Sequence, residues 1–218
     1  MIVIVAGMHR SGTSALAGLL HHNGIIMGEA ENWKPKPNRE NPKGFFENKQ
    51  FRMVNDRLLA EYAYKVKSFD PKIPLVETCS HTTWLSMDAL IKGYSIRYNA
   101  WGWKDPRTCL TLGVWLSVIR SQGLENQLRI LIPCRSTKDI ALSMLSRGNK
   151  GSMTQFEDLT RTYNKHLLLG CAKYSFLTVE FKDLIYRTEE VADRVGKYIG
   201  MPLTDTSFIE PRLAERVA

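Results

Sequence analysis

The chain begins with a short apolar run that leads through a glycine-containing turn directly into a helical segment. Ile2 to Ala6 is uninterrupted and rich in β-branched residues, which is typical of a strand buried on both faces of a sheet. Thr13 to His22 carries leucines at helical spacing, and Gly24 stands where a left-handed C-terminal cap is expected. A strand buried on both faces needs helices on each side. This opening therefore predicts an α/β fold.

The same alternation of strands and helices continues along the chain. Helical spacing over 47–62 and again around 84–91 precedes further predicted strands at 100–103, 129–134 and 176–181, with helices after each of them. We therefore expect a three-layer fold like that of P-loop nucleoside triphosphate hydrolases, with a central, mainly parallel sheet, helices on both faces and ligands at the carboxyl ends of the strands. The length of 218 residues predicts one domain over 1–218.

The excess of basic residues indicates which kind of partner the protein binds. Thirty Lys and Arg against 22 Asp and Glu give a net charge of +8, which favours anionic partners. The basic residues are scattered and no nucleic-acid-binding signature is present, so a polyanion-binding module is the weaker alternative to an enzyme and no nucleic acid partner is expected. No apolar run approaches ~20 residues and no leader pattern opens the chain, which predicts no membrane span and a cytoplasmic location. The four cysteines are far apart and are expected to be reduced thiols.

The turn after the first predicted strand has the composition of an anion-binding loop. It reads Gly7-Met-His-Arg-Ser-Gly-Thr-Ser14, and its backbone N–H groups and the following helix N-terminus favour a phosphate. Compared with the loop G-x-x-x-x-G-K-[ST], Thr13 replaces the lysine that reaches the β- and γ-phosphates, while Arg10 supplies a cation inside the loop. We expect a ligand other than a triphosphate. A P-loop kinase of nucleotides or metabolites, with Ser14 as magnesium ligand, remains an alternative, as does a plain strand-to-helix turn.

Two motifs together resemble those of the sulfotransferases that use 3′-phosphoadenosine 5′-phosphosulfate. The loop residues 10–14, Arg-Ser-Gly-Thr-Ser, match the 5′-phosphosulfate loop [KR]-S-G-T-[ST] of this family, and Arg135 with Ser143 match its Arg-x7-Ser pair for the 3′-phosphate. A guanidinium at a strand end and a hydroxyl two turns into a helix are able to converge on one anion. Alternatively, Arg135 pairs with Asp139 at the surface and Ser143 is solvated. The resemblance implies a set of donor-binding residues: His9, Arg10, Ser11, Gly12, Thr13, Ser14, Arg135 and Ser143.

Further matches point to one branch of the family. Trp103-Lys-Asp-Pro-Arg107 is similar to the Lys-x-Pro segment of glycan and tyrosine sulfotransferases, whereas the cytosolic branch has Lys-Thr-His there. Pro106 occupies the place of that catalytic histidine, so the base comes from elsewhere. The segment 179–202 looks like the closing strand and helix of the family. The glycine- and lysine-rich end of the cytosolic members is missing, which leaves open how the 3′-phosphate and adenine are covered. The chain thus resembles the glycan, Golgi-type and bacterial branch.

The resemblance implies a metal-independent transfer of a sulfuryl group from the donor to a hydroxyl or amine of an acceptor, for example on a glycan. Negative charge builds on the departing phosphate, and a proton leaves the acceptor. We expect Arg10 and Lys104 to stabilise the departing phosphate. No H-x-E, H-E-x-x-H or paired-carboxylate spacing indicates a metal site.

The base is expected among the glutamates between the first two predicted helices: Glu29, Glu31, Glu40 and Glu47. Glu47 is favoured because Gly44 and two phenylalanines are able to shield its carboxylate from water. Alternatively, Glu47 lies in the first turn of a helix and interacts with the helix dipole. His81 and Asp105 are further candidates for the base. Trp33, Trp101 and Trp103 either line an adenine or sugar site or pack in the core.

Overall fold

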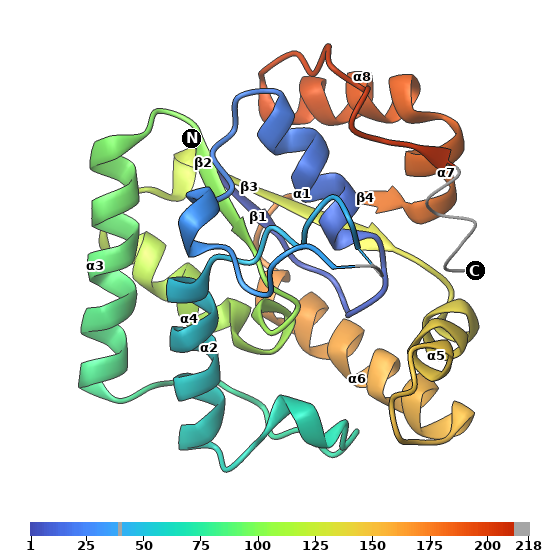
Figure 1. Ribbon diagram of the computed structural model, residues 1–218. Coiled ribbons are helices and arrows are strands. Elements are labelled where there is room, and N and C mark those ends of the chain that lie inside the picture. The colour runs from blue at the N-terminus through green and yellow to red at the C-terminus, as the bar shows by residue number, and fades with distance from the viewer. Residues whose placement is uncertain (39–40, 212–218) are drawn as a thin grey trace.

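A parallel sheet forms the centre of the protein in the computed structural model, which describes residues 1–38 and 41–211. Within these ranges the sheet has four strands in the order β2-β1-β3-β4 (Figure 1). The strands are β1 (Ile2–Val5), β2 (Trp101–Lys104), β3 (Leu128–Cys134) and β4 (Phe176–Glu180). Ile4 lies between Trp103 and Ile130 in the parallel register. The four predicted strands are confirmed, with every boundary within one residue of its predicted position.

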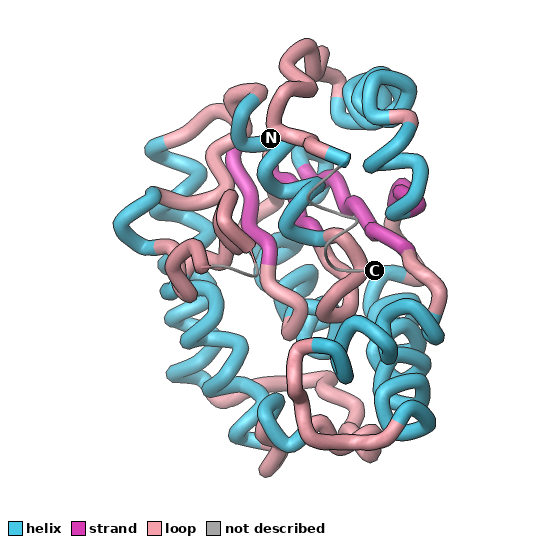
Figure 2. The backbone as a smooth tube through the Cα atoms, turned by 45° about the vertical axis from the view of Figure 1, so that its right-hand side comes forward, coloured by secondary structure: helices cyan, strands magenta, loops and turns pink. Residues whose placement is uncertain are grey.

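Helices cover the sheet on both faces, as Figures 1 and 2 show. Side chains alternate along β1, so Val3 and Val5 pack with one set of helices, and Ile2 and Ile4 pack with the other. The first set is α1, α7 and α8, and the second comprises α2 to α6. The helices are α1 (Thr13–His22), α2 (Lys49–Glu61), α3 (His81–Arg97), α4 (Thr108–Ser121), α5 (Thr137–Ser146), α6 (Met153–Cys171), α7 (Phe181–Tyr186) and α8 (Thr188–Ile199). The predicted three-layer α/β fold is confirmed.

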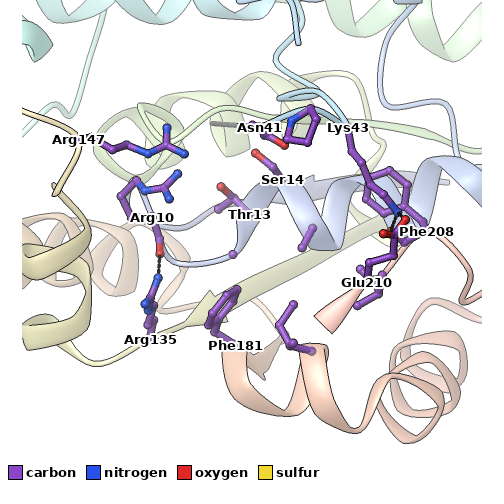
Figure 3. Close-up of a pocket in the computed structure, with 15 residues that line it drawn as sticks. Arg10, Thr13, Ser14, Asn41, Lys43, Arg135, Arg147, Phe181, Phe208 and Glu210 are labelled. Carbon is purple, nitrogen blue, oxygen red and sulfur yellow. Dashed lines mark hydrogen bonds and ion pairs between the residues drawn. The ribbon is translucent and has the colours of Figure 1, made fainter. Parts of the chain in front are cut away.

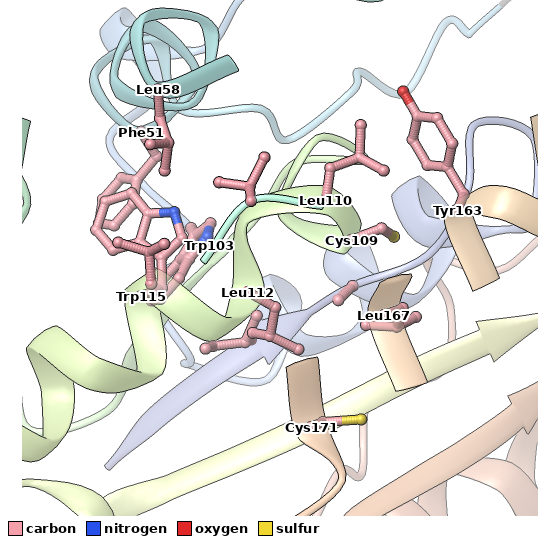
Figure 4. Packing of buried hydrophobic residues seen from close by; sticks show 14 of the residues in the cluster. Phe51, Leu58, Trp103, Cys109, Leu110, Leu112, Trp115, Tyr163, Leu167 and Cys171 are labelled. Carbon is pink, nitrogen blue, oxygen red and sulfur yellow. The ribbon is translucent and has the colours of Figure 1, made fainter. Parts of the chain in front are cut away.

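The larger core contains an aromatic cluster around Phe51 (Figure 4). Its ring stacks on Trp103 with 4.7 Å between centroids and lies 5.3 Å from Trp115. Trp101 and Trp103 are both buried, so they pack in the core and do not line a ligand site. Cys109 and the other three cysteines are free thiols, as predicted.

Two element boundaries differ from the sequence prediction. The helix expected over 47–62 begins at Lys49, because Asn48 has extended backbone and its side chain accepts a hydrogen bond from the Gln50 N–H at 2.9 Å. Glu47 therefore lies before the N-cap, outside the first helical turn. The last strand ends at Glu180, its last partner on β3 being Cys134, and the next residue begins the short helix α7.

None of the helices in the described ranges combines the length and the apolar character needed to cross a bilayer.

Candidate active site

The loop between β1 and α1 has a backbone that its own residues fix. Arg10 and Gly12 have positive φ angles of 71° and 96°. A Cβ at Gly12 would lie 2.5 Å from the ring of Phe181, so only glycine fits there without displacing that ring. The Ser11 hydroxyl donates to the carbonyl of Met8 at 2.8 Å, inside the loop. The loop is thus shaped before any ligand arrives.

The second predicted motif meets this loop. The Arg10 Nε donates to the Ser143 Oγ at 3.0 Å, and the Arg135 Nη1 donates to the Arg10 carbonyl at 3.3 Å. The guanidinium of Arg135 also lies 4.7 Å from the centroid of the Phe181 ring, as a cation–π contact. Ser143 is 2% exposed, so the alternative of a solvated hydroxyl is wrong. Residues from two distant motifs therefore converge on one place at the carboxyl ends of β1 and β3.

One cleft contains most of these side chains (Figure 3). Guanidinium groups gather at one end of it, and a phenylalanine and a charged pair stand at the other end, with the start of α1 between them. Ser14 lines the cleft, and its hydroxyl donates to the Phe45 carbonyl at 3.4 Å. The lining includes Arg10, Gly12, Thr13, Ser14, Arg135, Arg147, Phe181, Ile185, Lys43, Phe208 and Glu210. The cleft thus combines cations with apolar walls.

Glu47 and Lys104 form a second group beside the cleft, and neither of them lines it. The Lys104 Nζ lies 2.8 Å from the Glu47 Oε1, and the two residues are 2% and 7% exposed. Lys104 pairs in register with Val5, so it stands at the same edge of the sheet as the loop. Glu47 follows Phe45, whose carbonyl accepts from Ser14, by two residues. The dipole alternative for Glu47 is wrong because the carboxylate precedes the helix and pairs with an ammonium instead.

Asp105 belongs to a buried polar network under this group. It is 0% exposed, and its carboxylate accepts from Arg107 at 2.8 Å and from the Asn55 amide at 2.9 Å. Burial alone would raise the pKa of Asp105, but Arg107 and these hydrogen bonds hold that pKa below its ordinary value. The Arg107 guanidinium also reaches Asp56 at 2.6 Å. Asp105 is thus a charged, fully engaged acceptor.

His9 faces this network from the loop and does not line the cleft. Its ring lies edge-on to Tyr163, with 6.0 Å between centroids, and its Nε2 is buried without a hydrogen-bond partner. Burial, followed by the nearby charge of Arg107, lowers the pKa of His9 to about 3. The imidazole is therefore neutral near pH 7.

The remaining candidate bases occupy other places. The carboxylate of Glu29 accepts from the hydroxyl of Tyr98 and pairs with Arg97, both at 3.0 Å. Glu31 is exposed on a short 3-10 turn, Ala30–Asn32, and His81 is exposed at the first residue of α3. The candidate Glu40 lies outside the described residues.

The chain resembles known proteins in its fold and not in its sequence. No protein-family model matches the chain, and no curated protein matches its sequence. Among solved structures, the sulfotransferase domain of the olefin synthase of Synechococcus PCC 7002 matches with a TM-score of 0.59 and 16% identity, over 100% of this chain and 80% of that chain. The chain has the fold of a sulfotransferase domain.

Two further structures carry the same description. The sulfotransferase domain from the curacin biosynthetic pathway matches with a TM-score of 0.50 and 14% identity, over 97% of this chain and 76% of that one. The sulfotransferase STF1 from Mycobacterium tuberculosis matches with a TM-score of 0.49 and 18% identity, over 94% and 68%. The match to the olefin synthase domain confirms the predicted resemblance to sulfotransferases at the level of the fold.

Sequence analysis missed several residues that line the cleft of this sulfotransferase fold. Arg147 follows Ser143 by four residues, one helical turn, and this spacing was the available signal. Phe181 directly follows β4, whose carboxyl end lies at the ligand edge of the sheet. Phe208 and Glu210 carried no local signal, because only the course of the chain after α8 brings them to the cleft.

Proposed function

We propose that this chain transfers a sulfuryl group from 3′-phosphoadenosine 5′-phosphosulfate to a hydroxyl or amine of an acceptor. The observation that carries the proposal is that Arg10 and Arg135 line one cleft and are joined by hydrogen bonds, Arg10 to the buried Ser143 hydroxyl and Arg135 to the Arg10 carbonyl. A donor with a phosphate at both the 5′ and the 3′ position needs cations for two anionic groups within the reach of one nucleotide. The sulfotransferase fold of the solved structures supports the same assignment.

The chemical character of the cleft fits such a donor. Arg10 and Arg135 supply donors for anionic oxygens, and guanidinium groups favour bidentate contacts with phosphate. Phe181 and Ile185 provide an apolar wall of the kind that a nucleoside base packs against. Thr13 stands where a lysine would contact the outer phosphates of a triphosphate, so the P-loop kinase is the weaker proposal.

The transfer requires charge stabilisation at one end and removal of a proton at the other. The bond between the sulfur and the 5′-phosphate oxygen breaks, and the departing adenosine 3′,5′-bisphosphate keeps the electron pair. A new bond forms between sulfur and the acceptor oxygen or nitrogen, whose proton passes to a base. In this proposal Arg10 stabilises the departing phosphate, and Lys104 is the second cation at the same sheet edge.

Glu47 is the base in this proposal. Its carboxylate already holds a proton donor, the Lys104 ammonium, at 2.8 Å. When Glu47 takes the acceptor proton, its negative charge is lost. The Lys104 ammonium beside it is then attracted to the departing phosphate. The acceptor approaches from the side of Glu47 and Lys104, because the donor occupies the cleft that these two residues do not line.

Thermal unfolding with nucleotides tests the proposal. Adenosine 3′,5′-bisphosphate at about a hundred times its dissociation constant should stabilise the native state by ~2.7 kcal/mol and raise the Tm by roughly 5–10 °C at this chain length. ATP with magnesium should raise it little, and Arg135→Ala should abolish the rise caused by the bisphosphate. A rise in Tm with ATP and magnesium, together with no rise with the bisphosphate, would contradict the proposal and favour the kinase.

The role of Glu47 has its own prediction. Glu47→Gln should lower kcat with labelled donor by a factor of about 10²–10⁴, because the acceptor proton loses its base. The thermal shift with the bisphosphate should persist, since Glu47 does not line the cleft. The variant also leaves the Lys104 ammonium without its anionic partner, so its own Tm should fall.

Glu29→Gln is the matched control, because Glu29 is also a glutamate paired with a cation, Arg97, but it lies away from the proposed donor site. This variant should keep its kcat. If Glu47→Gln retained the wild-type kcat, or if Glu29→Gln lost it, Glu47 would not be the base.

A further inference from the structure

The end of helix α5 presents a further guanidinium, that of Arg147, to the cleft. Arg135 precedes the helix, Ser143 lies within it, and Arg147 is its C-cap residue. Ser143 and Arg147 are four residues apart, so they lie one above the other on the same face of the helix. The cleft is lined by Arg10, Arg135 and Arg147, and the buried Ser143 hydroxyl accepts a hydrogen bond from the Arg10 Nε.

The end of α5 holds Arg147 in a fixed place. Gly148 has a positive φ of 72°, and its N–H donates to the Leu145 carbonyl at 2.8 Å. The Asn149 side chain donates to the Met144 carbonyl, also at 2.8 Å. These bonds close the last turn of the helix. Arg147 is half-buried, and Figure 3 shows its side chain extending over the loop toward Arg10.

Among the described residues, no guanidinium lines the opposite end of the cleft. Lys43 is the cation there, and its ammonium lies 2.6 Å from the Glu210 carboxylate. The described part of the C-terminal segment lines the cleft with two apolar residues and this one carboxylate: Phe208, Ile209 and Glu210. A phosphate monoester carries a charge of about −1.5 to −2 and three acceptor oxygens, more than one guanidinium satisfies. Among the described residues that line the cleft, the guanidinium groups besides that of Arg135 belong to Arg10 on the loop and Arg147 at the end of α5.

We propose that Arg147 binds the 3′-phosphate of the donor together with Arg135 and Ser143. The inference rests on the proposed function, and it extends it by naming a residue that decides between 3′-phosphorylated and unphosphorylated nucleotides. Arg10 then serves the 5′ end of the donor, and the 3′-phosphate subsite consists of Arg135 before α5, Ser143 within it and Arg147 at its C-cap. Arg147 also lies at a helix C-terminus, where any cation interacts favourably with the dipole. That role alone predicts no effect on nucleotide preference.

Isothermal titration with two nucleotides distinguishes these roles. Adenosine 3′,5′-bisphosphate and adenosine 5′-monophosphate differ only in the 3′-phosphate. The wild type should prefer the bisphosphate. Arg147→Ala should weaken the bisphosphate by about 10- to 100-fold, the loss of a charge-assisted contact, and should change the monophosphate less than 2-fold. Arg147→Lys should recover part of the preference, and Lys150→Ala, which removes an exposed cation three residues further on, should leave it unchanged.

Each outcome separates the inference from the function on which it rests. Retained binding of the monophosphate by Arg147→Ala shows that the variant is folded. An unchanged ratio of the two affinities in Arg147→Ala, or an equal loss of both, overturns the assignment of Arg147 while the proposed donor stands. A wild type without preference for the bisphosphate overturns the proposed donor, and the inference with it.

Discussion

His9 places a buried, neutral imidazole beside the charged network of Arg107 and Asp105, and this lowers the stability of the protein in acid. An unfolded histidine has a pKa near 6.5, whereas burial and Arg107 lower that of His9 to about 3. Between these two values the unfolded chain binds a proton that the native state does not. The free energy of unfolding therefore falls as the pH falls, by up to ~1.4 kcal/mol per pH unit from this residue.

The variant His9→Gln removes this titration. From pH 7.5 to pH 5 the wild type should lose about 2 kcal/mol more stability than His9→Gln does, because only the wild type carries the proton-binding imbalance at this site. Urea unfolding at a series of pH values measures the difference, and the other titrating groups cancel between the two proteins. Parallel stability curves over that range would show that His9 titrates as an ordinary histidine.

Elements whose fold depends on local pattern were predicted correctly. The β1-loop-α1 unit has a buried strand, a glycine that needs a positive φ, and a helix start within 20 residues, so composition specifies it. The unit from β3 through Arg135 to α5 is likewise specified by nearby residues. Ser136 is the N-cap of α5, and its side chain accepts from the Asp139 N–H. Both units fold as their own residues dictate, and both carry residues that are proposed to bind the donor.

Boundaries and contacts that depend on residues far apart in the chain could not be predicted from local sequence patterns. The separation of α7 from β4 reflects where the parallel ladder with β3 ends, at Glu180, and not a break in the hydrophobic pattern. The pairing of Glu47 with Lys104 spans 57 residues and depends on the order of the strands. The roles of Glu47 and Lys104 in catalysis stay predictions, because the structure fixes their contact and not their chemistry.

At the scale of the whole molecule, the chain after α8 returns to the first helix and closes one end of the cleft. Phe208 is buried against Phe46 and His22, with 5.5 and 4.7 Å between ring centroids. The Lys43 ammonium lies 4.9 Å from the centroid of the same ring and pairs with Glu210. Segments from the beginning and the end of the described chain therefore share one wall of the proposed donor site.

The contact between Phe208 and α1 depends on Gly18. Whether alanine at this position raises or lowers the free energy of unfolding therefore tests the contact. A Cβ at Gly18, in the middle of α1, would lie 2.0 Å from the Phe208 ring, whereas Gly93 in α3 has no neighbour within 4 Å of that position. Alanine ordinarily stabilises a helix relative to glycine by up to ~1 kcal/mol, so Gly93→Ala should raise the free energy of unfolding. Gly18→Ala should lower it by about 1–3 kcal/mol, because the ring must leave its site.

The affinity for the nucleotide should also depend on the contact between Phe208 and α1. Displacing Phe208 opens the apolar end of the cleft, so Gly18→Ala should also weaken the bisphosphate in the titration, while Gly93→Ala should not. The double variant Gly18→Ala with Phe208→Ala should be less destabilised than the sum of the two single variants, because the alanine methyl then has room beside α1. A Gly18→Ala protein as stable as Gly93→Ala would mean that the C-terminal segment does not press on α1. The cleft would then be open at that end, and the carboxylate of Glu210 would be no part of its wall.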